Sequence, residues 1–300
     1  IGIKLAKIAL GGPMSELTRF SPKQTMDSTT FQITHSKDTY LPYLELHHHD
    51  FYEIYFFISG NVSMSIEGKH YKLLPGDMIL INTLELHQAL IHDPAIPYER
   101  IVLWVNKSFL KSLSTPLTNL ESCFSTYTSS NNLLRCTESI IDAIHITLKK
   151  ILEAKKATSF GSDILYHTYL TELLVLINRA FENTQASCIY QHHYSELVSN
   201  CIEYIHDHIE EELSLDTLAQ TLYTSKYHLI REFKKYTGLT VHRYMIKKKL
   251  AFSKELILKD YAISEVYKRC GFGDYSNFFR AFKQEYGMTP KEFYSTSIQK

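Results

Sequence analysis

The chain has 300 residues, of which 44% are apolar and 21% are charged, and its formal net charge is zero. This length and composition are typical of a globular protein with about two domains. No segment reaches the roughly 18 to 20 consecutive apolar residues that a membrane-spanning helix needs, so the sequence predicts no membrane partner.

The cysteines and the N-terminal residues indicate the compartment. The five cysteines are odd in number, widely spread and include no Cys-x-x-Cys pair. This pattern argues against structural disulfides and against a cysteine zinc site. The first residues lack the charged, apolar and small-residue regions of a secretory signal. We therefore expect a cytoplasmic protein.

The zero net charge hides a strong asymmetry along the chain. From Tyr223 to the end there are sixteen Lys and Arg against seven Asp and Glu, whereas residues 1–222 have sixteen against twenty-five. A basic segment joined to an acidic one suggests a nucleic-acid-binding module attached to a different domain. Lys-rich helices that are simply solvated would give the same counts, so charge alone does not decide.

The first predicted domain contains strands. Residues 1–29 form an N-terminal extension to which the sequence assigns no role. From 30 to 107, short β-branched and aromatic runs such as YEIYFFISG and YERIVLWV alternate with turn residues. Such runs predict antiparallel strands that form a small barrel or sandwich.

Residues 108–182 have a helical period. Apolar residues recur three and four apart over 138–156 and 162–181, with Ser162 placed as an N-cap. The second helix has two apolar stripes, formed by Leu165, Tyr169, Leu173, Leu176 and Ala180 and by Leu170, Leu174, Ile177 and Phe181. A helix that is apolar on two faces must bury both, so we expect this segment to form a homodimer; packing within its own core is the alternative.

The end of the chain repeats itself with an offset of 49 residues, after a polar, aperiodic segment at 183–195 that predicts a linker. The repeat aligns Arg231, Phe233, Lys234, Gly238 and Thr240 with Arg280, Phe282, Lys283, Gly287 and Thr289. Each copy predicts two short helices and a tight turn, which is the helix-turn-helix unit that places its second helix in the major groove of DNA. A helix over 242–258, about 25 Å long, would separate the two copies.

Helical periodicity separates inward from outward positions in each copy. Leu229, Phe233, Phe278 and Phe282 are predicted to point inward. The residues predicted to face base edges in double-stranded promoter DNA are Lys226, Tyr227, Ile230 and Arg231 in the first copy and Tyr275, Ser276, Asn277 and Arg280 in the second. Lys234, Lys283 and the run from Lys247 to Lys249 are predicted to neutralise phosphates.

These residues resemble the AraC/XylS-type transcription regulators. The most specific part is CGFGDYSNFFRAFKQEYGMTPKEFY at 270–294, and the resemblance extends from about Phe31 to Tyr294. One departure is Tyr267, where such units usually have a small residue.

The resemblance implies an α+β fold of two domains. An antiparallel β cupin-like barrel at 30–107 would be followed by the helices of 108–182, and an all-α double helix-turn-helix domain would occupy 196–300. It further implies a bacterial regulator that is not an enzyme, that binds a small-molecule effector such as a sugar in the barrel, and that has RNA polymerase as a further partner.

The segment HHHDFYEIYFFISG at 47–60 resembles the first metal motif of cupins. Together with a later histidine it offers four possible ligands, His47, His49, Glu53 and His87. Three imidazoles and one carboxylate could hold Fe(II), Mn(II), Ni(II) or Zn(II). The second cupin motif is incomplete, with Asn82 and Leu84 in place of proline and glycine. We therefore expect no cofactor, with a divalent metal, and a cupin metalloenzyme fused to a DNA-binding domain, as the alternative.

The same part of the chain contains the expected effector-binding residues, because a small-molecule site combines apolar and aromatic walls with a few polar groups. They are His47, His49, Tyr52, Glu53, Tyr55, His87 and Trp104. The neighbouring His48 is expected to be solvated.

Overall fold

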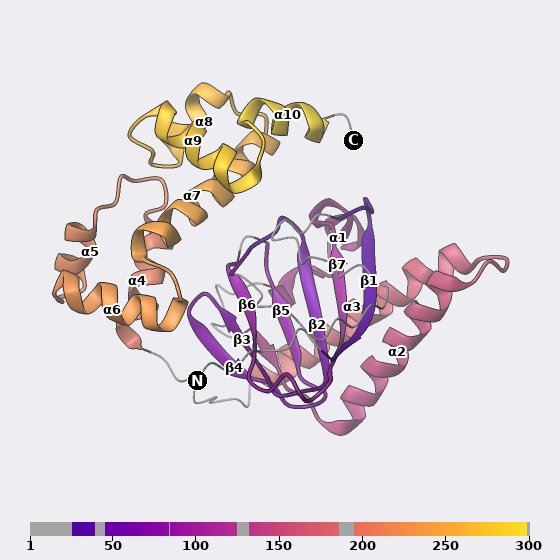
Figure 1. Ribbon diagram of the computed structural model, residues 1–300. Helices are drawn as coiled ribbons and strands as arrows, with labels where there is room; N and C mark the ends of the chain where they lie inside the picture. The colour runs from indigo at the N-terminus through magenta and orange to yellow at the C-terminus, as the bar shows by residue number, and fades with distance from the viewer. Residues whose placement is uncertain (1–25, 40–45, 84, 125–131, 186–194, 299–300) are drawn as a thin grey trace, which may run out of the picture.

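The computed structural model describes residues 26–39, 46–83, 85–124, 132–185 and 195–298. Most of the expected extension at 1–29 and of the expected linker at 183–195 lies outside these residues. Figure 1 shows the strands of the N-terminal half and the helices of the C-terminal half as two adjacent bodies. Among the described helices, none is both long enough and apolar enough to cross a membrane.

Two antiparallel sheets form the N-terminal domain, as predicted. One has five strands in the order β1-β7-β2-β5-β8 and the other has three in the order β4-β3-β6. The strands are β1 (Phe31–Asp38), β2 (Tyr52–Ser59), β3 (Val62–Ile66), β4 (Lys69–Lys72), β5 (Met78–Ile81), β6 (His87–Ile91), β7 (Tyr98–Val105) and β8 (Leu133–Leu134). Strand β8 was not predicted from the sequence, because two residues are too few to show alternation and because β8 follows the expected end of the barrel at 107.

Alternation along β2 decides which side chains face the barrel interior. Ile54 and Phe56 pack with the helices outside the barrel, whereas Tyr55 and Phe57 pack inside it between the two sheets. Tyr52 follows the outer set, and its hydroxyl donates a hydrogen bond of 3.0 Å to Glu121. The prediction that Tyr52 faces a bound effector is therefore wrong, since it lies one residue out of phase with Glu53.

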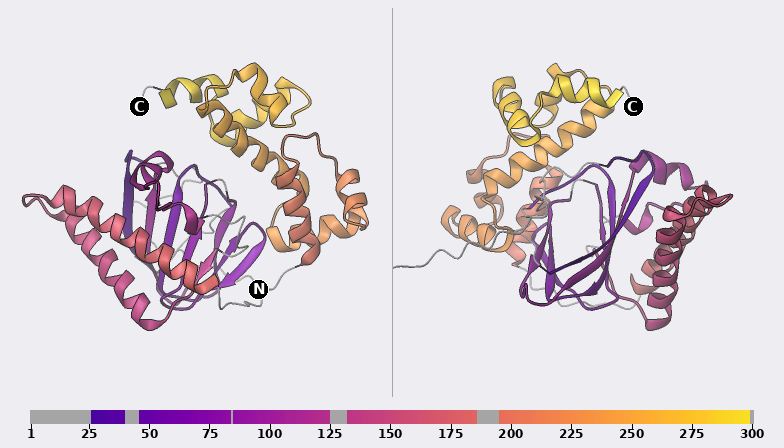
Figure 2. Two further views of the ribbon diagram at one scale, coloured as in Figure 1. Left: turned by 180° about the vertical axis from the view of Figure 1, so that it is seen from behind. Right: turned by 45° about the vertical axis from the view of Figure 1, so that its right-hand side comes forward.

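The helices that follow the barrel are α1 (Lys107–Leu113), the short 3₁₀ helix η1 (Ser122–Phe124), α2 (Glu138–Lys156) and α3 (Ser162–Gln185). Figure 2 shows α2 and α3 side by side against the barrel, on the side away from the C-terminal helices. Leu173 and Ala180 of the first stripe are buried in this domain's own core together with all four residues of the second stripe. Ser162 is the first helical residue and its hydroxyl donates to the Ser159 carbonyl, so its expected role as N-cap is wrong.

The C-terminal domain consists of seven helices among the described residues. They are α4 (Glu196–Asp207), α5 (Leu215–Thr221), α6 (Lys226–Thr237), α7 (Val241–Leu258), α8 (Ile263–Arg269), α9 (Tyr275–Tyr286) and α10 (Pro290–Ile298). One core gathers residues of α4 to α7 and a second gathers residues of α7 to α10. The long helix α7 therefore belongs to both units and fixes their separation (Figure 1).

The structure confirms the internal repeat. Gly238 and Gly287 end α6 and α9 with φ of 74° and 68°, a left-handed conformation that favours glycine. The Thr240 and Thr289 hydroxyls then each accept a hydrogen bond of 3.2 Å from a backbone N–H three residues later. Both copies thus end the second helix and start the next one by the same local interactions.

Candidate DNA-binding surface and barrel site

The second helix of each helix-turn-helix unit presents the predicted DNA-facing residues to solvent. Ser225 and Asp274 cap α6 and α9 by accepting hydrogen bonds from the backbone N–H groups of His228 and Asn277. The inward predictions are confirmed, since the four core residues of these helices are all fully buried. All ten predicted DNA-facing residues are exposed, namely Lys226, Tyr227, Ile230, Arg231, Lys234, Tyr275, Ser276, Asn277, Arg280 and Lys283.

The two exposed faces differ in which groups their polar side chains contact. In the second unit, Asn277 donates to the Asp274 carboxylate and accepts a hydrogen bond of 2.7 Å from Arg280. In the first unit, Arg231 contacts the His228 ring nitrogen at 3.2 Å, on a face where Tyr227 is 75% exposed. Arg231 also lies 3.5 Å from a carboxylate oxygen of Glu232. Both guanidinium groups therefore have contacts on their own helix, and in the second unit the partner is Asn277, itself a predicted base-reading residue.

Three lysines that were predicted to neutralise phosphates do not face solvent. Lys249 donates hydrogen bonds of 2.8 and 2.7 Å to the carbonyls of Glu211 and Gly271, and Lys247 pairs with Glu285. Lys248 is 2.8 Å from a carboxylate oxygen of Glu67 in the barrel. The phosphate prediction is wrong for this run, because α7 lies inside the domain and its lysines connect the segments around it.

The unusual Tyr267 is accommodated by an aromatic contact. Its ring is half-buried on α8 and meets the Tyr275 ring edge to face, with centroids 5.8 Å apart. The larger side chain thus lies behind an outward residue of α9, where it restricts the rotamers that Tyr275 can adopt.

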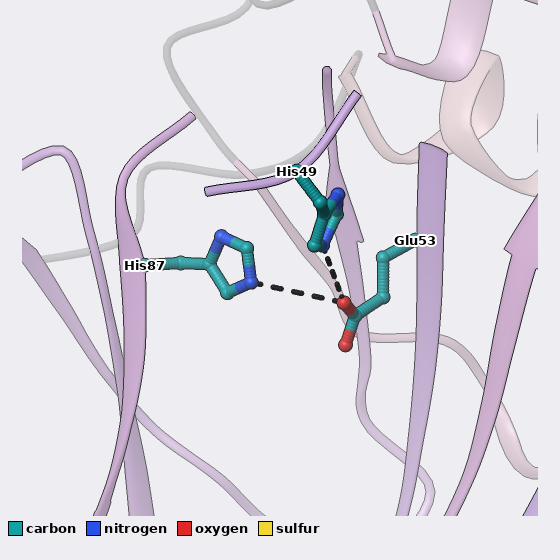
Figure 3. Close-up of side chains that lie close together, drawn as sticks. All are labelled: His49, Glu53 and His87. Atoms are coloured by element: carbon teal, nitrogen blue, oxygen red, sulfur yellow. Dashed lines mark hydrogen bonds and ion pairs between the residues drawn. The ribbon is translucent and has the colours of Figure 1, made fainter. Parts of the chain in front are cut away.

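Inside the barrel, three polar side chains from separate segments converge (Figure 3). A carboxylate oxygen of Glu53 is 2.8 Å from Nε2 of His49 and 3.7 Å from Nε2 of His87. Their donor atoms all lie within 4.8 Å of one another, and all three residues are buried. Burial lowers the pKa of His49 to about 4 and holds the pKa of His87 well below its usual range, so both rings are neutral near pH 7.

Other residues expected at the effector site surround these three. Trp104 pairs with Glu53 across β7 and β2, and the Trp104 indole nitrogen and the Tyr55 hydroxyl are buried with no hydrogen-bond partner among the described residues. His47 contacts the His87 ring edge to face, with centroids 4.3 Å apart. Apart from Tyr52, the expected effector residues therefore lie in or beside one buried region, whereas His47 is not one of the three converging donors.

The barrel contacts the C-terminal domain through charged groups that no sequence motif marks. Glu67, in the turn between β3 and β4, accepts hydrogen bonds from Lys248 and from the Tyr244 hydroxyl of α7. Asp50 pairs with Lys254 at 3.0 Å. The partners of Glu67 and Asp50 are nearly 200 residues away in the sequence, so no local pattern predicts these contacts. The only sequence signal is that both residues lie next to turn residues.

The segments that carry the barrel histidines take part in the same contact. Leu86 is fully buried in the core of the first helix-turn-helix unit, and Leu46 packs against that core. The expectation that His48 is solvated is wrong. It lies 3.3 Å from the Tyr286 hydroxyl, and burial together with nearby lysines holds its pKa well below the usual range.

Comparison with known proteins identifies the family. A model of the AraC-like ligand binding domain matches residues 32–174, and a helix-turn-helix domain model matches residues 218–295. The HTH-type transcriptional activator RhaS of Enterobacter sp. (strain 638) is 24% identical over 264 residues, which cover 82% of this chain and 86% of the relative. The probable transcriptional regulator LumQ of Photobacterium leiognathi is 24% identical over 248 residues, with coverage of 82% and 90%.

Two solved structures are also similar. ToxT from Vibrio cholerae O395 is 14% identical, with a TM-score of 0.36, and the match covers 89% of this chain and 98% of ToxT. The C-terminal domain of AraT, a response regulator from Geobacillus stearothermophilus, is 27% identical, with a TM-score of 0.34 and coverage of 35% and 88%. The relatives named above are regulators, which does not favour a metalloenzyme. The two family models together match most of the sequence, and the chain therefore belongs to the AraC family of DNA-binding transcription regulators with an N-terminal ligand-binding domain.

Proposed function

We propose that this regulator reads promoter DNA with the exposed faces of α6 and α9 and that a small polar effector in the barrel controls it. The observation that supports DNA reading by α6 and α9 is their shared pattern. Each helix buries Leu or Phe side chains on one side and exposes basic and polar side chains on the other. Arg pairs with guanine and Asn with adenine in the major groove, and Ile230 fits a thymine methyl group. We further propose a cytoplasmic location and RNA polymerase as a partner, as expected of a regulator that binds promoter DNA.

The effector proposal rests on the barrel interior. Two imidazoles and one carboxylate converge there, and the Tyr55 hydroxyl and the Trp104 indole nitrogen have no hydrogen-bond partner among the described residues. These are the oriented polar groups that a small-molecule site needs. A sugar offers hydroxyl groups that would complement such donors and acceptors, so sugars are the first class of effector to test.

The DNA-reading residues can be tested by single substitutions. Arg231→Ala should weaken binding to a promoter site selected from random-sequence DNA by about 10- to 100-fold, because one Arg–guanine contact contributes on the order of 1 to 3 kcal/mol. Arg280→Ala should have the smaller effect, because Arg280 is engaged with Asn277. The measurement is a fluorescence anisotropy titration at fixed salt.

Lys259→Ala is the matched control, since it removes one exposed positive charge of the same domain away from α6 and α9. Lys259→Ala should change the affinity for DNA less than about twofold, because a charge that does not contact DNA acts only through the long-range electrostatic field, which salt screens. If Arg231→Ala binds as tightly as Lys259→Ala, then α6 does not read DNA through this residue.

We also propose that the protein is a homodimer held together through the start of α3. Ile164 and Leu165 are 65% and 45% exposed on this helix, and the preceding Phe160 is fully exposed. Contiguous apolar side chains at one end of a helix pair favour association with a second copy.

Light scattering at micromolar concentration should therefore give a dimer for the natural sequence and a monomer for Leu165→Glu. Ser112→Glu, which adds the same charge at an exposed position of α1, should remain a dimer. A natural chain that scatters as a monomer would refute this interface.

A further inference from the structure

The hydrogen bonds of the two barrel histidines fix which ring nitrogens carry protons. Nδ1 of His49 is 2.9 Å from the Phe51 carbonyl oxygen, and Nδ1 of His87 is 2.8 Å from the Glu85 carbonyl oxygen. A carbonyl oxygen can only accept, so both Nδ1 atoms must donate. Whenever the ring is neutral, as a metal-bound imidazole is, the other nitrogen has a lone pair and no proton. The two carbonyl contacts therefore leave Nε2 of each ring as the nitrogen that can bind a metal ion.

Three acceptors consequently face one another in a buried space. Nε2 of His49, Nε2 of His87 and the Glu53 carboxylate all present lone pairs, and Nε2 of His87 has no hydrogen-bond partner among the described residues. A proton on Glu53 could satisfy only one of the two nitrogens, because a carboxyl group has one proton. A divalent cation satisfies all three acceptors at once.

The donor set also has the chemistry of a metal site. Two histidines and one carboxylate are a common set for Fe(II) and for Zn(II), with positions left open for water or another ligand. Bonds of about 2.0 to 2.2 Å place neighbouring ligand atoms roughly 3 to 3.5 Å apart. Glu53 lies 2.8 Å from His49 and 3.7 Å from His87, and the three donor atoms lie within 4.8 Å of one another, so side-chain adjustments of about 1 Å would bring them to these distances. The Phe51 and Glu85 carbonyls supply the outer hydrogen bonds that typically orient metal-bound histidines.

We infer that the barrel binds a divalent first-row transition metal ion through His49, Glu53 and His87, and that this ion strengthens the contact between the barrel and the DNA-binding domain. The inference rests on the proposed function, because it names the ligand chemistry of the proposed effector site. The open positions of the metal can take an oxygen atom of a polar effector.

The link to the DNA-binding domain follows from the residues next to the ligands. Leu86 directly precedes His87 and lies in the core of the first helix-turn-helix unit, while Asp50 directly follows His49 and pairs with Lys254 of α7. Coordination restrains both segments, and a restrained segment gives up less conformational entropy when it docks. Metal binding therefore stabilises the docked arrangement.

The test uses the full chain, purified without a polyhistidine tag and freed of metal by chelation. Isothermal titration with Zn(II), Mn(II), Ni(II) and, under anaerobic conditions, Fe(II) should give one site per chain for at least one ion, and Co(II) should give visible absorption bands. Glu53→Gln keeps the size of the side chain and should weaken binding at least 10-fold. His35→Ala removes a barrel histidine outside the site and should bind as the natural sequence does.

Hydrogen exchange with and without the metal reads out the link between the domains. Exchange in α4 and α7 should slow when the metal binds to the natural sequence and should not change in Glu53→Gln. Absence of stoichiometric binding, or binding that Glu53→Gln leaves intact, overturns the site; protection confined to the barrel overturns the link. DNA affinity of the metal-free protein, measured in parallel, tests the proposed function separately.

Discussion

Glu67→Ala should detach the barrel from the first helix-turn-helix unit and lower the stability of the contact by about 3 to 5 kcal/mol, the usual cost of removing one partner of a buried ion pair. The side chains of Glu67 and Lys248 are only 13% and 11% exposed. Glu67 also accepts from the Tyr244 hydroxyl and from the Leu86 backbone N–H. Removing its carboxylate therefore leaves a buried ammonium and a buried hydroxyl without this acceptor.

Hydrogen exchange in α7 and thermal unfolding of the full chain measure this effect. Glu67 has a φ of 46°, and with Gly68 at 75° it forms the two-residue turn between β3 and β4. Asparagine suits that turn, but its side chain is too short to reach Lys248. Glu67→Asn should therefore lower the stability of the contact between the domains by as much as Glu67→Ala. Glu203→Ala, at an exposed position of α4, should change the free energy of unfolding by no more than about 0.5 kcal/mol. If Glu67→Asn were as stable as the natural sequence, the ion pair would not hold the domains together.

Gly271→Ala should destabilise the DNA-binding domain by about 4 kcal/mol or more, an effect expected where a new side chain meets rigid backbone. Gly271 lies in the turn of the second helix-turn-helix unit at a φ of 64°. A Cβ atom there would lie 2.2 Å from the Glu211 carbonyl oxygen and 2.7 Å from Nζ of Lys249. The substitution would therefore push apart the segments that Lys249 connects.

Gly238→Ala separates this clash from backbone strain. Gly238 has a similar φ of 74°, but a Cβ atom would meet nothing within 4 Å. It should cost only about 1 kcal/mol, the usual penalty of a left-handed conformation for alanine. The measurement is the thermal unfolding temperature and DNA affinity of both variants. Equal losses for the two substitutions would mean that the close approach at Gly271 is not what limits stability.

The two helix-turn-helix units could be predicted from the sequence because their determinants are local. Inward and outward positions follow from the period of one helix, and the offset of 49 residues pairs the Gly and Thr caps of α6 and α9 without any knowledge of tertiary structure. The predicted inward and outward positions of α6 and α9 therefore agree with the structure. The prediction that the lysines of α7 face solvent was wrong, because a basic run on a helix has the same sequence pattern whether solvent or another segment covers it.

The barrel site was predicted only in part. The spacing of the histidines and Glu53 reflects strand alternation, which is local, and the structure brings His49, Glu53 and His87 together. Tyr52 was assigned to the wrong side of β2, since the sequence does not say which of two apolar faces is the barrel interior. The tautomers of His49 and His87 depend on carbonyl groups whose orientation only the folded chain sets.

The sequence by itself therefore determined the double helix-turn-helix, its exposed residues and the strands of the ligand-binding domain, because each depends on periodicities and caps within a few residues. Only the tertiary structure decided that Glu67, Asp50 and Leu86 join the barrel to α4 and α7. These contacts link residues up to about 200 positions apart, and their energy comes from burial and charge pairing that exist only once both domains have folded.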